Sequence, residues 1–239
     1  MSDLIIGRHP VAEALRAGVS IKRIFISPGA KPAPILQEIR ELAEEAGLSV
    51  QNESRTNLDR LAGGKSHQGV IATAAPFDYH SAENLLAQES PRLVLLDGVT
   101  DPANLGSILR SSEAFGWSGV LVPRRRSVGV TPAVRKVAAG AAERVPVALV
   151  GSAADAVLNL TKQGVFVVGL DPEAGMDYRE VDYEQPICLV LGAEGPGLSR
   201  LVRERADALI SIPMKGRQAS INVAVAAAVV MVEVTRVRG

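Results

Sequence analysis

Three segments in the second half of the sequence combine glycine-rich turns with polar side chains, and each follows an apolar run typical of a buried strand. They are "DGVTDPANLGSILRSSEAFG", "LGAEGPGLSR" and "IPMKGRQASINVAVA". Ligands of open parallel sheets bind beyond the carboxyl ends of the strands, so we expect the three segments to meet there. Glycines let a loop approach a ligand closely, and the helix that follows presents unpaired backbone N–H groups. The pattern favours a nucleoside-bearing ligand held by main-chain contacts.

The polar residues of these segments also have simpler interpretations. Asn104 could cap the helix that it opens, and Ser220 could cap the last helix. Arg110 and Glu113 could form an i, i+3 surface pair. The coincidence of polar groups in all three loops favours one shared site. Neither the dinucleotide fingerprint nor the phosphate-binding loop occurs at a strand end, which argues against a nicotinamide-dependent oxidoreductase.

Global charge does not identify a partner, because the sequence has 26 basic and 26 acidic residues. Any anionic partner must therefore be met by local patches. Basic clusters adjoin the three segments at 124–126, at 135 and 136, and at Lys215 with Arg217. They could be a solvated rim, or they could contact RNA phosphates.

Composition and periodicity predict an α/β protein. The hydrophobic share is 47% while aromatics make up only 3%, which is typical of aliphatic helices packed on a sheet. We expect a small α/β domain at 1–75, a polar linker at 76–91 between two prolines, and a second domain at 92–239. In the second domain, strands alternate with helices, which predicts parallel pairing with helices on both faces.

Several element boundaries follow from capping and periodicity. We expect a helix capped by Thr56, a helix over 104–115, a helix over 198–205 and a final helix opening near Ser220. That final apolar run contains Asn222 and Glu233, so it predicts a buried helix rather than a membrane span. The early Asp3 argues against a secretory signal.

The single cysteine, Cys188, lies in a strand-like run and excludes an intramolecular disulfide. It predicts a small buried side chain and a reducing, cytoplasmic setting. The three histidines all fall in or beside the first domain, so no His/Cys cluster predicts a metal site. His67 could touch RNA, although an ordinary loop histidine is the simpler interpretation.

Together, the three segments resemble the signature motifs of the SpoU family of RNA ribose 2′-O-methyltransferases. The matching stretches are "DPANLGSILRSSEAFG", "LVLGAEGPGLS" and "ISIPMKGRQASINVAVAAA". The resemblance extends over both domains, because "IIGRHPVAEALRAG" and "KSHQGV" are similar to the family's substrate-binding domain, which itself resembles small ribosomal RNA-binding proteins.

The resemblance implies a C-terminal domain with a deep trefoil knot, S-adenosylmethionine as cofactor and a homodimer formed through that domain. A knot could not be expected otherwise, because true knots are essentially absent from proteins. By motif, the resemblance assigns catalytic roles to Asn104, Arg110, Glu194, Ser220 and Asn222. It assigns cofactor contacts to Gly192, Gly195, Ile212, Met214 and Ile221.

The resemblance implies methylation of a ribose 2′-hydroxyl, on a guanosine in the peptidyl-transferase region of 23S rRNA. The alternatives are a tRNA guanosine 2′-O-methyltransferase and a non-catalytic RNA-binding ribosome assembly factor. Because a guanidinium is not normally deprotonated, we expect Arg110 to orient an RNA phosphate and ease alkoxide formation. We expect Glu194 to pair with Arg110 or to hold Asn222.

Overall fold

The computed structural model describes residues 3–238 and divides into two compact units. One unit contains the chain up to Asp78 together with Thr131–Gly140, and the other contains Tyr79–Val130 and the chain from Ala141 onward. Residues 1, 2 and 239, the ends of the two predicted domains, lie outside the described residues.

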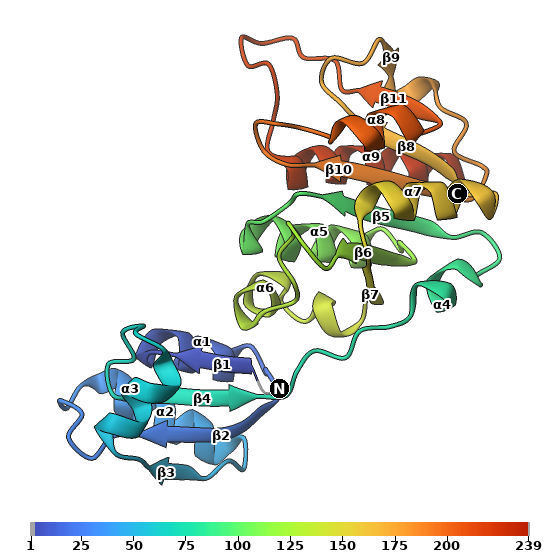
Figure 1. Ribbon diagram of the computed structural model, residues 1–239. Coiled ribbons are helices and arrows are strands. Elements are labelled where there is room, and N and C mark those ends of the chain that lie inside the picture. The colour runs from blue at the N-terminus through green and yellow to red at the C-terminus, as the bar shows by residue number, and fades with distance from the viewer. Residues whose placement is uncertain (1–2, 239) are drawn as a thin grey trace. The chain divides into compact units, whose positions relative to one another are not determined.

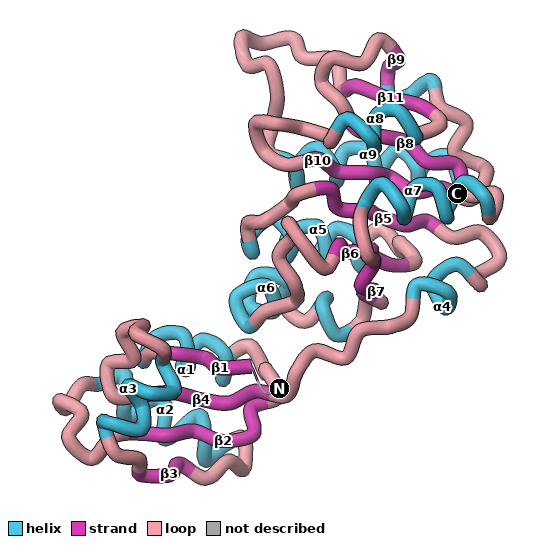
Figure 2. Tube along the Cα trace, viewed as in Figure 1, coloured by secondary structure: helices cyan, strands magenta, loops and turns pink. Residues whose placement is uncertain are grey.

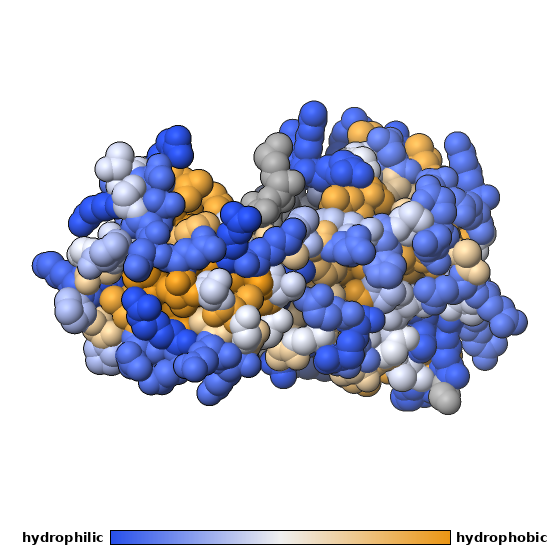
Figure 3. Space-filling view, turned by 90° about the horizontal axis from the view of Figure 1, so that it is seen from below, coloured by the Kyte–Doolittle hydropathy of each residue, from blue (hydrophilic) through white to orange (hydrophobic). Residues whose placement is uncertain are grey.

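The first unit is a four-stranded sheet with helices. Its elements are β1 (Asp3–Ile6), α1 (Arg8–Arg16), β2 (Ile21–Ile26), α2 (Pro34–Glu45), β3 (Val50–Asn52), α3 (Arg55–Ala62), β4 (Val70–Ala74) and α6 (Pro132–Ala138). The strand order is β1-β4-β2-β3, with β4 antiparallel to both neighbours and β2 parallel to β3. In Figure 3, hydrophilic side chains cover much of the face seen from below, with hydrophobic areas between them.

Two side-chain contacts in this unit differ from the simplest expectations. Ser54, not Thr56, caps α3, because its hydroxyl accepts the N–H of Asn57. His67 is buried, with Nε2 2.9 Å from Oδ1 of Asp59, and its Nδ1 accepts the N–H of Gly69. The ring of His67 is therefore a structural part of the turn that leads into β4.

The second unit contains a seven-stranded sheet. Its elements are α4 (Ala82–Leu86), β5 (Arg92–Asp97), α5 (Pro102–Ala114), β6 (Gly119–Pro123), η1 (Ala141–Glu143), β7 (Val147–Val150), α7 (Ala153–Lys162), β8 (Phe166–Leu170), β9 (Met176–Asp177), η2 (Tyr178–Glu180), β10 (Ile187–Gly192), α8 (Arg200–Arg205), β11 (Ala208–Ser211) and α9 (Val223–Arg238). The order is β7-β6-β5-β10-β8-β11-β9, and every pairing is parallel (Figure 1). The predicted α/β fold with a parallel sheet is confirmed.

Helices cover both faces of this sheet. On one face, side chains of α4, α7 and α8 pack with Leu93, Leu95 and Cys188. On the other face, α5 packs against α9, and α9 contacts β10. Because neighbouring residues of a strand point to opposite faces and helices cover both, the central strands β5 and β10 are apolar between their terminal residues.

Two helices of this unit start elsewhere than expected. The first, α5, begins at Pro102 and is capped by Asp101, whose Oδ1 accepts the N–H of Ala103, so Asn104 lies inside the helix. The last, α9, begins at Val223, because Oδ1 of Asn222 accepts the N–H groups of the next turn. The interpretations of Asn104 and Ser220 as caps are therefore wrong.

Cys188 is fully buried in β10, and burial raises the pKa of its thiol. Within residues 3–238, no helix is long and apolar enough to cross a membrane. The same part of the chain holds no group of three or more His, Cys, Asp or Glu side chains able to bind a metal ion.

Candidate active site

The three polar segments meet at the carboxyl edge of the parallel sheet. From β5 the chain winds through β6 to β7, whereas β8 lies on the far side of β10, so the winding direction reverses around β10. Such reversals open the crevice in which α/β proteins bind ligands. Figure 2 shows the long loops that gather at this edge.

The loop after β10 is folded tightly against its own strand. The backbone groups of Ala193 and Gly197 exchange two hydrogen bonds of 3.0 and 2.9 Å. A Cβ placed on Gly192 would lie 2.3 Å from the carbonyl carbon of Gly197, a backbone overlap that nothing nearby can relieve. Gly192 is therefore a glycine because the returning loop passes directly over it.

Three polar side chains, one from each segment, form a closed hydrogen-bonded triad of Asn104, Glu194 and Asn222. Nδ2 of Asn104 donates to Oε1 of Glu194 at 3.0 Å. Nδ2 of Asn222 donates to Oδ1 of Asn104 at 2.8 Å and to Oε1 of Glu194 at 2.9 Å. Residues far apart in the sequence are thus fixed in one constellation.

Backbone contacts set the orientation of the triad. Oδ1 of Asn222 accepts the N–H groups of Ala224 and Val225 at 2.9 and 3.3 Å, so its NH₂ group must face Asn104 and Glu194. Asn104 is only 5% exposed in α5, and Glu194 is held by the loop after β10. One carboxylate oxygen accepting two amide donors makes a rigid polar centre.

A cavity of about 360 Å³ adjoins the triad. All five residues expected to contact a cofactor line it, namely Gly192, Gly195, Ile212, Met214 and Ile221. Glu194, Ser220 and Asn222 line it too. Its size matches small-ligand pockets of ~300–1,000 Å³, and its apolar walls with nearby backbone suit a nucleoside. The residues present therefore fit a cofactor such as S-adenosylmethionine.

Arg110 does not join the triad. Its side chain is exposed and makes no hydrogen bond or ion pair within residues 3–238. The expected pair with Glu113 is also absent, because Glu113 binds Nε of Arg144 at 2.7 Å, a contact that lowers the pKa of the Glu113 carboxyl. Glu194 was expected to pair with Arg110 or to hold Asn222, and the structure shows the contact with Asn222.

Two supporting carboxylates were not anticipated from the sequence. Oδ2 of Asp97, at the end of β5, accepts the N–H of Ser199 at 2.6 Å and so ties the β10 loop to β5. Asp171 is buried and lies 2.7 Å from Nη1 of Arg203, between Leu170 and Pro172, which line the cavity. The position of Asp97 at the end of an apolar run could have pointed to its role. No sequence pattern pointed to a role for Asp171.

The comparisons with known proteins identify the family. Residues 91–232 match the SpoU rRNA Methylase family, and residues 4–80 match the RNA 2′-O ribose methyltransferase substrate binding family. Because the first match covers more than half of the chain, this protein belongs to the SpoU methyltransferase family.

Individual relatives agree with this assignment. A TrmH-family tRNA/rRNA methyltransferase of Staphylococcus saprophyticus is 41% identical, over 98% of this chain and 96% of the relative. A tRNA/rRNA methyltransferase of Mycolicibacterium vanbaalenii is also 41% identical, over 99% of this chain and 77% of the relative. The AdoMet-bound rRNA methyltransferase of Sinorhizobium meliloti has a TM-score of 0.65 and 26% identity, covering 98% and 87% of the two chains.

A solved structure concerned with 2-OH methylation of C/U34 on tRNA also resembles this chain. Its TM-score is 0.56 at 26% identity, and the similarity covers 62% of this chain and 96% of that one. The partial coverage matters for the choice of RNA substrate.

Proposed function

We propose that this protein transfers a methyl group from S-adenosylmethionine to a ribose 2′-hydroxyl of a guanosine in the peptidyl-transferase region of 23S rRNA. The observation that carries the proposal is the Asn104–Glu194–Asn222 triad beside a cavity of nucleoside size. Structures of related methyltransferases hold S-adenosylmethionine, which supports the choice of cofactor.

S-Adenosylmethionine, when bound, would supply an activated sulfonium methyl group. The chain's own residues then have to place the acceptor hydroxyl in line with that group. Positioning alone can contribute effective molarities of ~10⁵ to 10⁸ M. Gly192 and Gly195 would hold the cofactor through backbone atoms, with Ile212, Met214 and Ile221 as the apolar walls.

The triad would orient the acceptor ribose. Glu194 already accepts two amide donors, so it acts as a fixed support for Asn104 and Asn222. Ser220 stands on the cavity wall, where its hydroxyl can donate to a ribose oxygen. These roles need no metal ion, because the sulfonium group is already activated.

Arg110 would act on the RNA phosphate. An exposed guanidinium with no partner in the described chain is free to bind a phosphate and to stabilise charge that develops on the 2′-oxygen. It would act as a base only in a dry and electropositive site, because a guanidinium otherwise keeps its proton.

A homodimer through the second unit is part of the proposal, as are the trefoil knot and a cytoplasmic location. Val225 and Val232 lie seven residues apart on α9 and are 53% and 47% exposed. That spacing puts both side chains on one face of the helix, where a second copy could bury them. The family membership supports the knot, which would lie in the loops after β10 and β11.

Coverage favours rRNA over tRNA as the substrate. The similarity to the solved rRNA methyltransferase covers 98% of this chain. The similarity to the structure concerned with tRNA methylation covers only 62% of this chain but 96% of that one, so that structure has no counterpart of the remaining residues. Residues 4–80 match a substrate-binding family, so we assign RNA recognition to the first domain (1–75), with 76–91 as linker and 92–239 as the methyltransferase domain.

The test is a methyl-transfer assay with labelled S-adenosylmethionine and two unmodified transcripts, 23S rRNA and a tRNA, followed by nuclease mapping. We expect label on a guanosine of the 23S rRNA. Label on the tRNA would keep the chemistry and overturn the substrate. Absence of label on both, with RNA still bound, would support an assembly factor instead.

A further inference from the structure

A second hollow, which we call the arginine groove, lies beside the candidate active site in the same unit. Its volume is about 1100 Å³, larger than the ~300–1,000 Å³ of small-ligand pockets. Four segments line it: the end of β5, the loop after β6, the start of α7 with the residues before it, and the loop after β10 with the start of α8. Ala193 and Gly197 line both the arginine groove and the cofactor cavity, so the two share one wall.

Arg124, Arg125 and Arg126 project from one side of the arginine groove. All three are exposed, and none makes a side-chain hydrogen bond or ion pair within residues 3–238. Arg200, on the opposite side, is already paired with Glu204 at 2.6 Å. Three uncommitted guanidinium groups on consecutive residues therefore dominate the charge of the groove.

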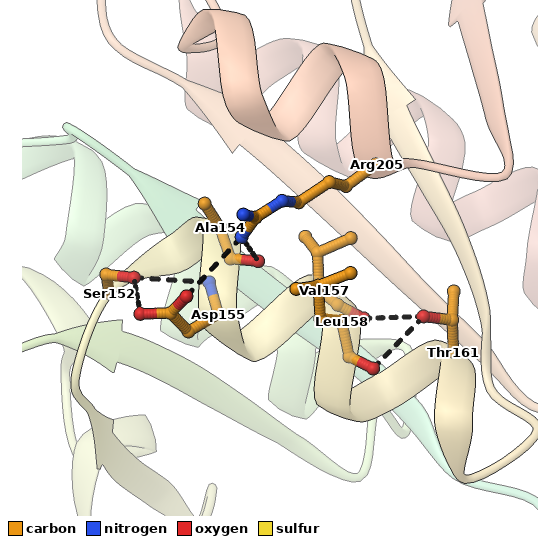
Figure 4. Close-up of polar contacts among 7 residues, drawn as sticks. All are labelled: Ser152, Ala154, Asp155, Val157, Leu158, Thr161 and Arg205. Atoms are coloured by element: carbon orange, nitrogen blue, oxygen red, sulfur yellow. Dashed lines mark hydrogen bonds and ion pairs between the residues drawn. The ribbon is translucent and has the colours of Figure 1, made fainter.

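Two acidic residues, Asp97 and Asp155, also line the groove, and both make hydrogen bonds. Asp97 accepts the N–H of Ser199. Asp155 accepts from the hydroxyl of Ser152 and lies 3.4 Å from Nη1 of Arg205, contacts that lower the pKa of its carboxyl (Figure 4). Arg205 also donates to the carbonyl of Ala154. The groove is lined by four arginines and two aspartates, so positive charge prevails.

The backbone of Arg126 has an unusual conformation. Its φ angle is +60°, in the left-handed region that residues with a side chain rarely adopt. Strained positions of this kind persist where the surrounding structure fixes them, and they cluster at ligand-binding sites. All three adjacent arginines of this turn line the same groove.

We infer that the arginine groove binds the phosphates of the RNA strand that flanks the acceptor ribose, with Arg124, Arg125 and Arg126 as the contacts. The inference rests on the proposed function. The inference follows from three guanidinium groups without a partner in the described chain, a hollow of about 1100 Å³ and a wall shared with the cofactor cavity. Such contacts fix the position of RNA without reading its sequence.

The test compares the double variant Arg124→Gln/Arg125→Gln with the control Arg144→Gln/Lys162→Gln. The control removes the same charge from the same unit at residues that do not line the groove. RNA affinity is measured by filter binding with 23S rRNA and tRNA transcripts between about 50 and 200 mM salt. Cofactor affinity is measured separately by calorimetry with S-adenosylmethionine.

We expect the groove variant to bind RNA about 10-fold to 100-fold more weakly at low salt, with cofactor affinity unchanged. The slope of log affinity against log salt should flatten by about 1.4, since each lost single-strand contact removes about 0.7. Equal affinities and slopes for the groove variant and the control would overturn the inference. If neither transcript is methylated but the groove variant still loses RNA affinity, RNA binding by the arginine groove is supported and the proposed function is contradicted.

Discussion

Nδ2 of Asn222 donates a hydrogen bond of 2.8 Å to Oδ1 of Asn104, across 118 residues of sequence. The bond joins the start of α9 to the interior of α5. It is possible because Asn222 uses its oxygen to cap α9 and keeps its amide group for the triad. One asparagine therefore sets both the start of a helix and the geometry of the candidate active site.

The first prediction concerns the coupling of these two residues. Asn104→Ala and Asn222→Ala should each destabilise the second unit, and a double-mutant cycle should give a coupling energy of about 1 kcal/mol. Trp117, the sole tryptophan and a buried one, is the fluorescence probe of unfolding. Simple additivity of the two effects would mean that the bond contributes nothing to stability.

A second prediction separates the charge of Glu194 from its hydrogen bonding. Glu194→Gln keeps an oxygen at the position that accepts from Asn104 and Asn222, whereas Glu194→Ala leaves two donors without an acceptor. We expect kcat to fall by about 100-fold in the alanine variant and far less in the glutamine variant. Equal losses in both would show that the negative charge, not the geometry, is required.

Gly192 provides a third prediction. Gly192→Ala puts a methyl group into the backbone of Gly197 and should cost about 3 kcal/mol or more of folding stability, together with cofactor binding. Gly175→Ala is the matched control, because a Cβ there meets nothing within 4 Å. Thermal unfolding and calorimetry with S-adenosylmethionine measure the two effects. A stable Gly192→Ala protein with normal cofactor affinity would contradict the close approach of the loop.

A fourth prediction tests the role of Arg110. If the guanidinium binds an RNA phosphate in a fork, Arg110→Lys should keep the charge but lose most turnover at saturating RNA, by about 10-fold or more. Arg144→Lys, another exposed arginine of the second unit, is the control. Near-normal turnover of Arg110→Lys would show that a positive charge alone suffices.

The fifth prediction follows from the raised pKa of Cys188. Because burial favours the neutral thiol, the folded protein should react with a thiol reagent at pH 8 at least about 100-fold more slowly than the protein in urea. The unfolded thiol ionises near pH ~8.5, so this group lowers folding stability as the pH rises above that value. Equal labelling rates in the two states would contradict the burial of β10.

Much of the second unit was predictable because its strands are continuous apolar runs and its turns carry glycine or proline. The strands β5, β6, β8, β10 and β11 are mostly apolar runs of this kind. The strands β1 and β9 were missed, because β9 has only two residues and β1 is separated from α1 by Gly7 alone. Their pairing depends on neighbours that only the folded chain brings together.

The site was predictable as a set of residues but not as a network. Three motifs at three strand ends indicated that Asn104, Glu194 and Asn222 would converge. The role of Asn222 as a cap was hidden, because nearby Ser220 fits the same local preference. The pairing of Glu113 with Arg144 instead of Arg110 was equally hidden, since it spans 31 residues.

The measurement that tests the central claim most directly is the chemical position of the transferred methyl group. RNA labelled by the protein from methyl-labelled S-adenosylmethionine is hydrolysed with alkali, which cleaves only next to a free 2′-hydroxyl. The account predicts label in alkali-resistant dinucleotides, with none from Asn222→Ala/Arg110→Ala. Label released as mononucleotides would place the methyl group on a base and contradict the account.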